Sequence, residues 1–457
     1  MAKITRRNLL KSGAVLTAGT VTGAGTGAMY AEAADRAGSR YNWGHIEDFG
    51  TQYYKRMTEI IENIRRTEMN KVGDISSRMA DAIKNGNQVW LQAHEGHMGR
   101  YENDETNPGN PRIMRSLGVP DWIGASKETI ASLKKGDVFM TNHVTEPIHD
   151  ARERGVYVVG VPVNYVFNED TPPGFRRPNV NNWFLRDVSN IVLQSYIPYT
   201  QGIVDCPEIP EMKICPSSAN SLYTIFWMFQ CEVANKVKNK NAKHVDKSQV
   251  VIDTILERIH EVYRLQKDYI FDNAPTVAKM IGRGSHYFVT SDNPGVQEES
   301  HFVAMGPMIT NEFRQVVIYD RSLRGTDDLR KGDVHLFASD NPDSPIIIEE
   351  MKKAKDMGMF TVAIASGNSF EIRRLSDVFI DNLNPEGTGL MNIDGFDKKV
   401  GSLGSVLNNT IMWIFTAQFV DEMVRRGWIP WFYMGGYVTG GGDYNKAVRP
   451  LFLKQGF

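Results

Sequence analysis

The sequence predicts an α/β fold, built as two tandem three-layer α/β/α sandwiches with mainly parallel sheets. Two observations support this prediction. A strand–loop–helix–strand pattern stands out in the second half of the chain, and the order of such elements in the first half is repeated in the second. Strand–helix–strand crossovers join parallel strands through right-handed connections. A chain of 457 residues is long enough for two or three domains.

The clearest crossover consists of two apolar runs with a helical pattern between them. Val334–Ala338 and Phe360–Ala365 are short and continuously apolar, as strands covered on both faces are. Residues 346–357 have helical periodicity and are followed by Gly358, a residue common just after helices. Ligands of such sheets bind beyond the carboxyl ends of the strands. The loop at 339–344 is therefore the first candidate for a binding loop.

An internal repeat predicts the domain organisation. Five landmarks of the first half recur in order in the second half: 53–91 with 251–289, 133–138 with 329–334, 152–159 with 355–362, 186–191 with 376–381, and 215–237 with 400–424. Agreement by chance at five places is improbable, so the sequence predicts a duplicated unit. We expect the two copies at 53–240 and 246–430, an irregular segment at 34–52, and a mobile glycine-bearing tail at 431–457.

The first 33 residues resemble a twin-arginine export signal. Arg6 and Arg7 precede a Leu-Leu-Lys sequence, a mildly apolar stretch follows, and residues 31–33 fit a small-x-small cleavage site. This resemblance implies export to the periplasm or another compartment outside the cytoplasm. After cleavage we expect no stable membrane span, because the remaining apolar runs are short.

Composition narrows the classes of partner. A net charge of −2 and the absence of a basic stripe argue against nucleic acid. The three cysteines, Cys206, Cys215 and Cys231, have no zinc-binding spacing. Cys206 and Cys215 could pair in an exported protein, or all three could be plain thiols. We expect no cofactor and no metal.

Three short motifs carry a resemblance to a known family. They are Glu-Gly-His-Met at 95–98, Asp-Asn-Leu-Asn-Pro-Glu-Gly at 381–387 and Gly-Gly-Asp-Tyr-Asn at 441–445. In this order, and with the repeat, they resemble the sugar isomerase (SIS) family from residue 53 to the C-terminus. The resemblance implies tandem SIS domains, as in the isomerase half of glucosamine-6-phosphate synthase. It also implies a sugar or sugar phosphate as ligand, and a homodimer.

The family's phosphate loop, Ser-x-Ser-Gly-x-Ser/Thr, corresponds here to residues 339–344. Asn341 replaces the middle serine, and Pro342 replaces the glycine and removes an N–H donor. Asp340 and Asp343 add negative charge, which opposes phosphate. The sugar- or phosphate-binding residues that the resemblance and the strand ends predict are Ser291, Asn293, Ser339, Asn341, Ser344, Ser402 and Ser405. The alternative is that these serines only cap helices.

Carboxylates and imidazoles near the strand ends are the candidates for catalysis. Aldose–ketose isomerisation needs a base to move a proton between C1 and C2, and an acid to open the ring. The candidates are Glu298, Glu299 and His301 in the second copy and His97 and Glu102 in the first. The pattern His301 to Met305 is similar to the His-Phe-x-x-Glu of sedoheptulose-7-phosphate isomerases, but Met305 stands where the glutamate is expected. The alternative is solvated carboxylates beside a packed histidine.

Three hypotheses for function follow. The first is an isomerase or related lyase acting on a sugar derivative. The second is a non-catalytic protein that binds carbohydrate derivatives. The third, which has less support, is a metal-dependent hydrolase using His94, Glu95 and His97, because two histidines and a carboxylate can bind zinc.

Overall fold

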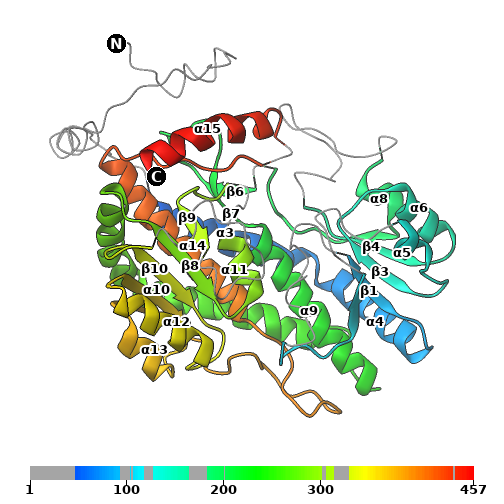
Figure 1. The fold of residues 1–457 in the computed structure, drawn as a ribbon. Helices are drawn as coiled ribbons and strands as arrows, with labels where there is room; N and C mark the ends of the chain where they lie inside the picture. The colour runs from blue at the N-terminus through cyan, green and yellow to red at the C-terminus, as the bar shows by residue number, and fades with distance from the viewer. Residues whose placement is uncertain are drawn as a thin grey trace.

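The computed structural model shows an α/β fold with mainly parallel sheets, which confirms the predicted class (Figure 1). It describes residues 47–92, 103, 107–117, 127–163, 183–199, 201–300, 305–312, 329–435 and 438–457. The predicted export signal at 1–33 lies outside these residues. Among the described helices, none combines the length and apolar character needed to cross a membrane.

The first sheet has five parallel strands in the order β2-β1-β3-β4-β5. The strands are β1 (Val89–Gln92), β2 (Met114–Ser116), β3 (Val138–Thr141), β4 (Tyr157–Gly160) and β5 (Ile191–Val192). Short helices accompany it on the side away from the centre: α5 (Lys127–Ala131), α6 (Glu146–Glu153) and α8 (Leu185–Val188). An antiparallel pair, β6 (Gly202–Val204) and β7 (Ile214–Pro216), follows in the chain.

The second sheet repeats this strand order as β9-β8-β10-β11-β12, again all parallel. Its strands are β8 (Tyr287–Ser291), β9 (Thr310–Glu312), β10 (Val334–Ala338), β11 (Phe360–Ala365) and β12 (Val378–Asp381). The helices between them are α11 (Pro294–Ser300), α12 (Pro345–Asp356) and α13 (Phe370–Leu375). One face of this sheet packs against α12 and α13 in a small separate apolar cluster.

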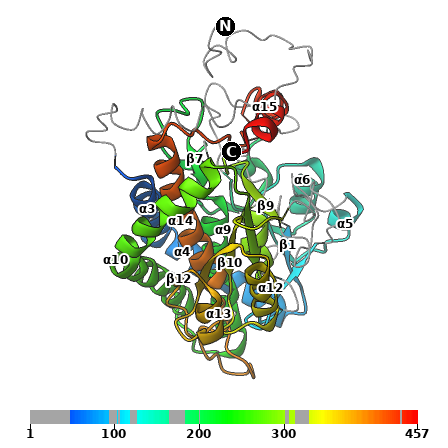
Figure 2. The ribbon, with the colours of Figure 1, turned by 60° about the vertical axis from the view of Figure 1, so that its left-hand side comes forward.

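The long helices lie between the two sheets and join them into one core (Figures 1 and 2). They are α3 (Phe49–Thr67), α4 (Met69–Lys84), α9 (Ser218–Lys238), α10 (Lys247–Gly282) and α14 (Gly404–Arg425). Helix α3, from the first half of the chain, packs against α14 and α10 of the second half. The two halves of the chain are therefore interlocked through these helices.

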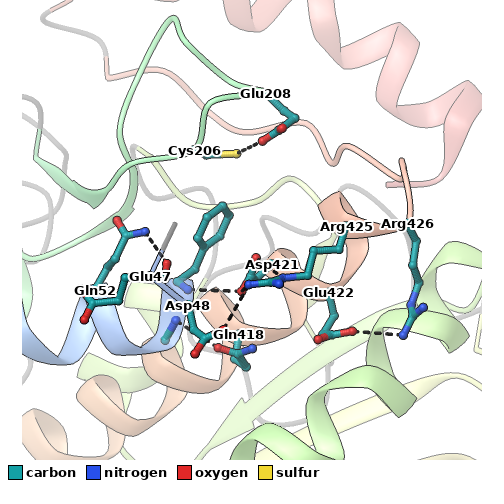
Figure 3. Close-up of polar contacts among 12 residues, drawn as sticks. Glu47, Asp48, Gln52, Cys206, Glu208, Gln418, Asp421, Glu422, Arg425 and Arg426 are labelled. Carbon is teal, nitrogen blue, oxygen red and sulfur yellow. Dashed lines mark hydrogen bonds and ion pairs between the residues drawn. The ribbon is translucent and has the colours of Figure 1, made fainter. Parts of the chain in front are cut away.

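The contact of α3 with α14 includes a polar joint at the start of α3 (Figure 3). Phe49 N–H donates to Asp421 Oδ2 at 3.4 Å, and Gly50 N–H donates to Gln418 Oε1 at 3.3 Å. Arg425 bonds both carboxylate oxygens of Asp421 at 3.0 Å and reaches Asp48 at 3.1 Å. Because the first N–H groups of a helix have no partner within it, α14 supplies acceptors to two of them.

Three sequence expectations about elements are wrong. Residues 49–52 begin α3 and are not irregular. The match of 251–289 with 53–91 implies two helices before β8, as α3 and α4 precede β1, but α10 is one continuous helix of 36 residues that contains Pro275. Part of the tail expected to be mobile forms the helix α15 (Gly441–Gln455), which buries Tyr444, Val448 and Phe452. Burial of this apolar stripe stabilises the helix.

Candidate functional site

The carboxyl ends of β8 and β10 lie side by side. In the parallel register Ser291, the last residue of β8, pairs with Ala338, the last residue of β10. The segments that follow, 292–293 and 339–344, therefore leave the sheet at one edge. This is the edge at which parallel sheets bind their ligands.

Asp292, the residue that follows β8, accepts hydrogen bonds from the 339–344 loop. Ser339 Oγ donates to Asp292 Oδ2 at 2.8 Å, and the backbone N–H of Asp340 donates to Asp292 Oδ1 at 2.9 Å. The side chains of Ser344 and Asn341 also hydrogen-bond to this carboxyl. Burial raises the pKa of Asp292, and these hydrogen bonds offset part of the rise.

Asp340 lies at the N-terminus of α14 and is only 4% exposed. Its Oδ2 accepts a hydrogen bond from Asn293 Nδ2 at 2.5 Å and a longer one from Ser402 Oγ at 3.5 Å. Its Oδ1 accepts one from Asn408 Nδ2 at 2.9 Å. Three side-chain donors thus converge on one carboxyl, whose two oxygens act as acceptors. The N-terminus of a helix favours a negative charge in this position.

A cavity of 530 Å³ opens at the same edge, beyond β11 and β12 and beside α10. Five charged side chains contribute to its lining: Glu257, Arg258, Glu261, Asp381 and Glu386. The guanidinium of Arg258 is held by Glu386 and by Asn384 Oδ1, each at 2.7 Å. The size falls in the range of small-molecule sites.

The segment 382–387 contacts both the cavity and the 339–344 loop that contains Asp340. Leu383, Pro385 and Glu386 line the cavity, while Asn382 and Gly387 approach the 339–344 loop. A Cβ atom added to Gly387, which has a φ of +64°, would lie 3.1 Å from the carbonyl oxygen of Asp340. A substitution of Asp340 that shifts its backbone can therefore move the wall of the cavity through the segment 382–387.

Glu299 lies apart from this cluster, in the interior near the first half of the chain. It is 6% exposed and sits beside Trp413 of α14 and Tyr53 of α3. Burial raises the pKa of Glu299 to about 8, and the indole of Trp413 offsets only part of that rise. Tyr53 donates to the carbonyl of Pro216 at 2.9 Å and accepts from Asn220 Nδ2 at 3.0 Å. A buried carboxyl with this pKa can exchange a proton near neutral pH.

The structure brings most of the predicted binding residues together. Ser339, Asn341 and Ser344 surround Asp292, while Asn293 and Ser402 contact Asp340.

The other predicted residues have different surroundings. Ser291 makes a local turn, with its hydroxyl accepting the Asn293 N–H at 3.0 Å. The Ser405 hydroxyl is buried and makes no hydrogen bond with any part of the chain that the structure describes. His97, Glu102, His301 and the Glu298 side chain lie outside the described residues.

The sequence analysis did not assign a site role to Asp292, Asp340, Arg258 or Asn408. Asp292 follows a predicted strand directly, and that position was the available signal. Asp340 was noted only as a charge that opposes phosphate. Arg258 on α10 contacts Asn384, which lies more than a hundred residues later in the chain. Asn408 on α14 contacts Asp340, which lies about 70 residues earlier. Periodicity within either helix does not reveal such partners.

The first copy presents a different strand end. Thr141 Oγ, at the end of β3, donates to Gln92 Oε1 at 3.0 Å and accepts the His143 N–H at 3.0 Å. The amide of the fully buried Asn142 has no hydrogen-bond partner in the described ranges. Within those ranges no three His, Cys, Asp or Glu side chains form a group that could hold a metal. His94, Glu95 and His97 lie outside them.

The three cysteines are buried free thiols. Cys206, at the loop before β7, contacts Glu208 at 3.7 Å (Figure 3). Burial raises the pKa of the Cys206 thiol to about 12. The alternatives were a Cys206–Cys215 disulfide and three plain thiols, and the structure has the plain thiols. At its raised pKa the Cys206 thiol is a poor nucleophile at neutral pH.

No family model matches the chain. It is similar to a UPF0309 protein of Brucella anthropi, 27% identical over 128 residues, or 26% of this chain and 52% of that protein. A UPF0309 protein of Listeria innocua is 21% identical over 227 residues, or 43% of this chain and 92% of that protein. The matched region thus spans about half of the first relative and most of the second.

Solved structures with a similar course of the chain include a candidate phosphosugar isomerase from Clostridium difficile 630. It has 10% identity and a TM-score of 0.49, and the match covers 83% of this chain and 94% of the other. The C-terminal domain of glucosamine-fructose-6-phosphate aminotransferase from Francisella tularensis has 9% identity and a TM-score of 0.40. That match covers 87% of this chain and all of the other.

Proposed function

We propose that this chain is a SIS-type protein that binds a sugar or sugar derivative at the carboxyl edge of its second sheet. The observation that carries the proposal is the convergence of two loops and a helix start at this edge, beside a cavity of 530 Å³. Hydroxyl, amide and carboxyl groups are the groups that bind sugar hydroxyls. The names of the similar structures, which include phosphosugar isomerases, agree with a carbohydrate ligand.

The catalytic form of this proposal is an aldose–ketose isomerase or related lyase with Glu299 as the acid/base. The ionised carboxyl would take the proton from C2 of the open-chain aldose, the freed electron pair would form the C1–C2 double bond of the enediolate, and the C2 hydroxyl proton would pass to the C1 oxygen. Return of the proton at C1 would give the ketose, so that no atoms are gained or lost. With a pKa of about 8, the base form of Glu299 would increase through that pH.

A non-catalytic carbohydrate-binding protein is the second candidate, and one observation favours it. Glu299 is buried beside Trp413 and near enough to Tyr53 to affect its pKa, and it is not among the residues that line the cavity beyond β11 and β12. A ligand in that cavity would not meet this carboxyl unless the inner helices rearranged.

One experiment separates the two candidates. The chain is incubated in D₂O with free aldoses and with their 6-phosphates, and NMR measures deuterium entering C1 or C2. An isomerase exchanges deuterium, and Glu299→Gln lowers the exchange at least a hundredfold while calorimetry still detects binding. Glu350→Gln, which changes a buried carboxyl on α12, is the matched control.

The outcomes of this experiment are distinct. Binding without exchange in the wild-type chain supports the carbohydrate-binding protein. No binding of any sugar by the wild-type chain contradicts both candidates.

We further propose that the chain is exported by the twin-arginine route and works as a homodimer. The paired Arg6 and Arg7 support the first statement, and the family resemblance supports the second. Changing both arginines to lysine should retain the chain in the cytoplasm. Sedimentation of the mature chain should give twice the mass of one copy, and a monomer at micromolar concentration would contradict the second statement.

A further inference from the structure

We propose that Asp292 and Asp340 occupy the two anion-binding elements of the strand-end site, so that its ligand is a sugar without a phosphate group. This inference rests on the proposed function, since it names the class of sugar for that same site. Three observations support it: the contacts of Asp292, the contacts of Asp340, and the charge of the cavity.

The 339–344 loop is built to hold an anion, and it holds Asp292. A backbone N–H, two serine hydroxyls and one asparagine side chain converge on this one carboxyl. Such a set of donors is the kind that binds a phosphate in other proteins. Pro342 removes a further N–H, which leaves fewer donors for a second anion.

The start of α14 is also occupied. Asp340 is 4% exposed and receives hydrogen bonds from Asn293, Asn408 and Ser402. Its Oδ1 lies 2.0 Å from the position that a Cβ atom of Gly404 would take, so the carboxyl touches the first residue of the helix. A phosphate at this helix start would have to displace Asp340 and overcome its charge.

The cavity beyond β11 and β12, which the segment 382–387 connects to the 339–344 loop, is acidic. Glu257, Glu261, Asp381 and Glu386 contribute four carboxyls to its lining, against the single guanidinium of Arg258. Glu386 already pairs with that guanidinium at 2.7 Å. A phosphate ester would meet repulsion there, whereas neutral hydroxyls or an amino group would find acceptors.

The test measures affinities of the full chain by calorimetry with two kinds of probe. Inorganic phosphate reports on the two anion-binding elements without any sugar. Glucose, glucosamine and their 6-phosphates report on the ligand class. The variants are Asp292→Ser, Asp340→Ser and the double variant, each checked for folding by thermal unfolding.

Asp343→Ser is the matched control. It removes a carboxylate from the same loop, but Asp343 Oδ1 accepts the N–H groups of Glu371 and Ile372 at the start of α13 instead of facing Asp292 or Asp340. It therefore changes the charge of the loop without vacating either element.

The wild-type chain should bind a free sugar at least tenfold more tightly than its 6-phosphate, and should not bind inorganic phosphate. The folded double variant should gain at least tenfold in affinity for inorganic phosphate, with no gain in Asp343→Ser. Tighter binding of 6-phosphates by the wild type, or no gain in the folded double variant, overturns the inference. If the wild type binds no sugar but the double variant gains phosphate affinity, the proposed function fails while the occupancy of the two elements stands.

Discussion

Asp340 packs directly against the backbone of Gly404, the first residue of α14. A Cβ atom at Gly404 would lie 2.0 Å from Asp340 Oδ1 and 2.3 Å from its Cγ. Glycine is required here because a side chain has no space, and not because of the backbone conformation, since φ of Gly404 is not positive. The contact places a carboxyl from one loop at the N-terminus of a helix that begins more than 60 residues later in the chain.

Gly404→Ala should therefore destabilise the protein. The new methyl group collides with a buried, hydrogen-bonded carboxyl that cannot move without losing partners, and overpacking of this kind costs about 1–3 kcal/mol in the free energy of unfolding. Urea unfolding measures the loss, and Asp340→Ser in the same chain should recover most of it. Gly442→Ala, in the first turn of α15 where nothing lies within 4 Å, is the control and should be neutral or slightly stabilising.

Glu299 should make stability depend on pH. Its pKa rises from 4.5 to about 8 on folding, so the folded state binds the proton more tightly than the unfolded state. The resulting stabilisation is complete below pH 4.5 and is lost as the pH rises through 8, by at most about 5 kcal/mol. Thermal unfolding from pH 5 to 9 should show a steeper fall in Tm for the wild type than for Glu299→Gln. Equal slopes for the two chains would disprove this assignment, and Glu349→Gln, an exposed carboxyl on α12, should behave like the wild type.

The polar joint between α3 and α14 should contribute to the coupling of the two halves of the chain. Asp421→Ala removes the acceptor of the Phe49 N–H and both bonds from Arg425, at a cost of about 2 kcal/mol in the free energy of unfolding. Glu422→Ala, one position along α14, breaks only the pair with Arg426 and should cost less than about 1 kcal/mol. Chemical denaturation of the two variants compares them, and equal losses would show that the joint adds nothing to a simple ion pair.

The sequence predicted β10 and β11 well because these strands are buried on both faces. Val334–Ala338 and Phe360–Ala365 were placed to the residue, and the helix between them to within one residue. Continuous apolar runs bounded by polar loops leave little freedom in such strands. The equivalent strand order of the two sheets also agrees with the predicted duplication.

The remaining features depend on contacts between distant segments. The amphipathic pattern of α3 predicts a helix with one apolar face, but the pattern does not say that this face meets α14. Likewise, the pattern predicts that Ser339 and Ser344 lie in a loop beyond a strand end, but it does not show that their partner Asp292 lies about 50 residues earlier. Local periodicity carries no information about such pairs.

A crystal structure with a bound sugar tests the central claim most directly. The sugar that binds most tightly in calorimetry is soaked into crystals of the mature chain. The account predicts electron density for that sugar beyond the carboxyl ends of β10, β11 and β12, within reach of Arg258 or Asp381, with Asp292 and Asp340 still in place. Density for the sugar at the strand ends of the first sheet, or on the outer surface, would contradict it.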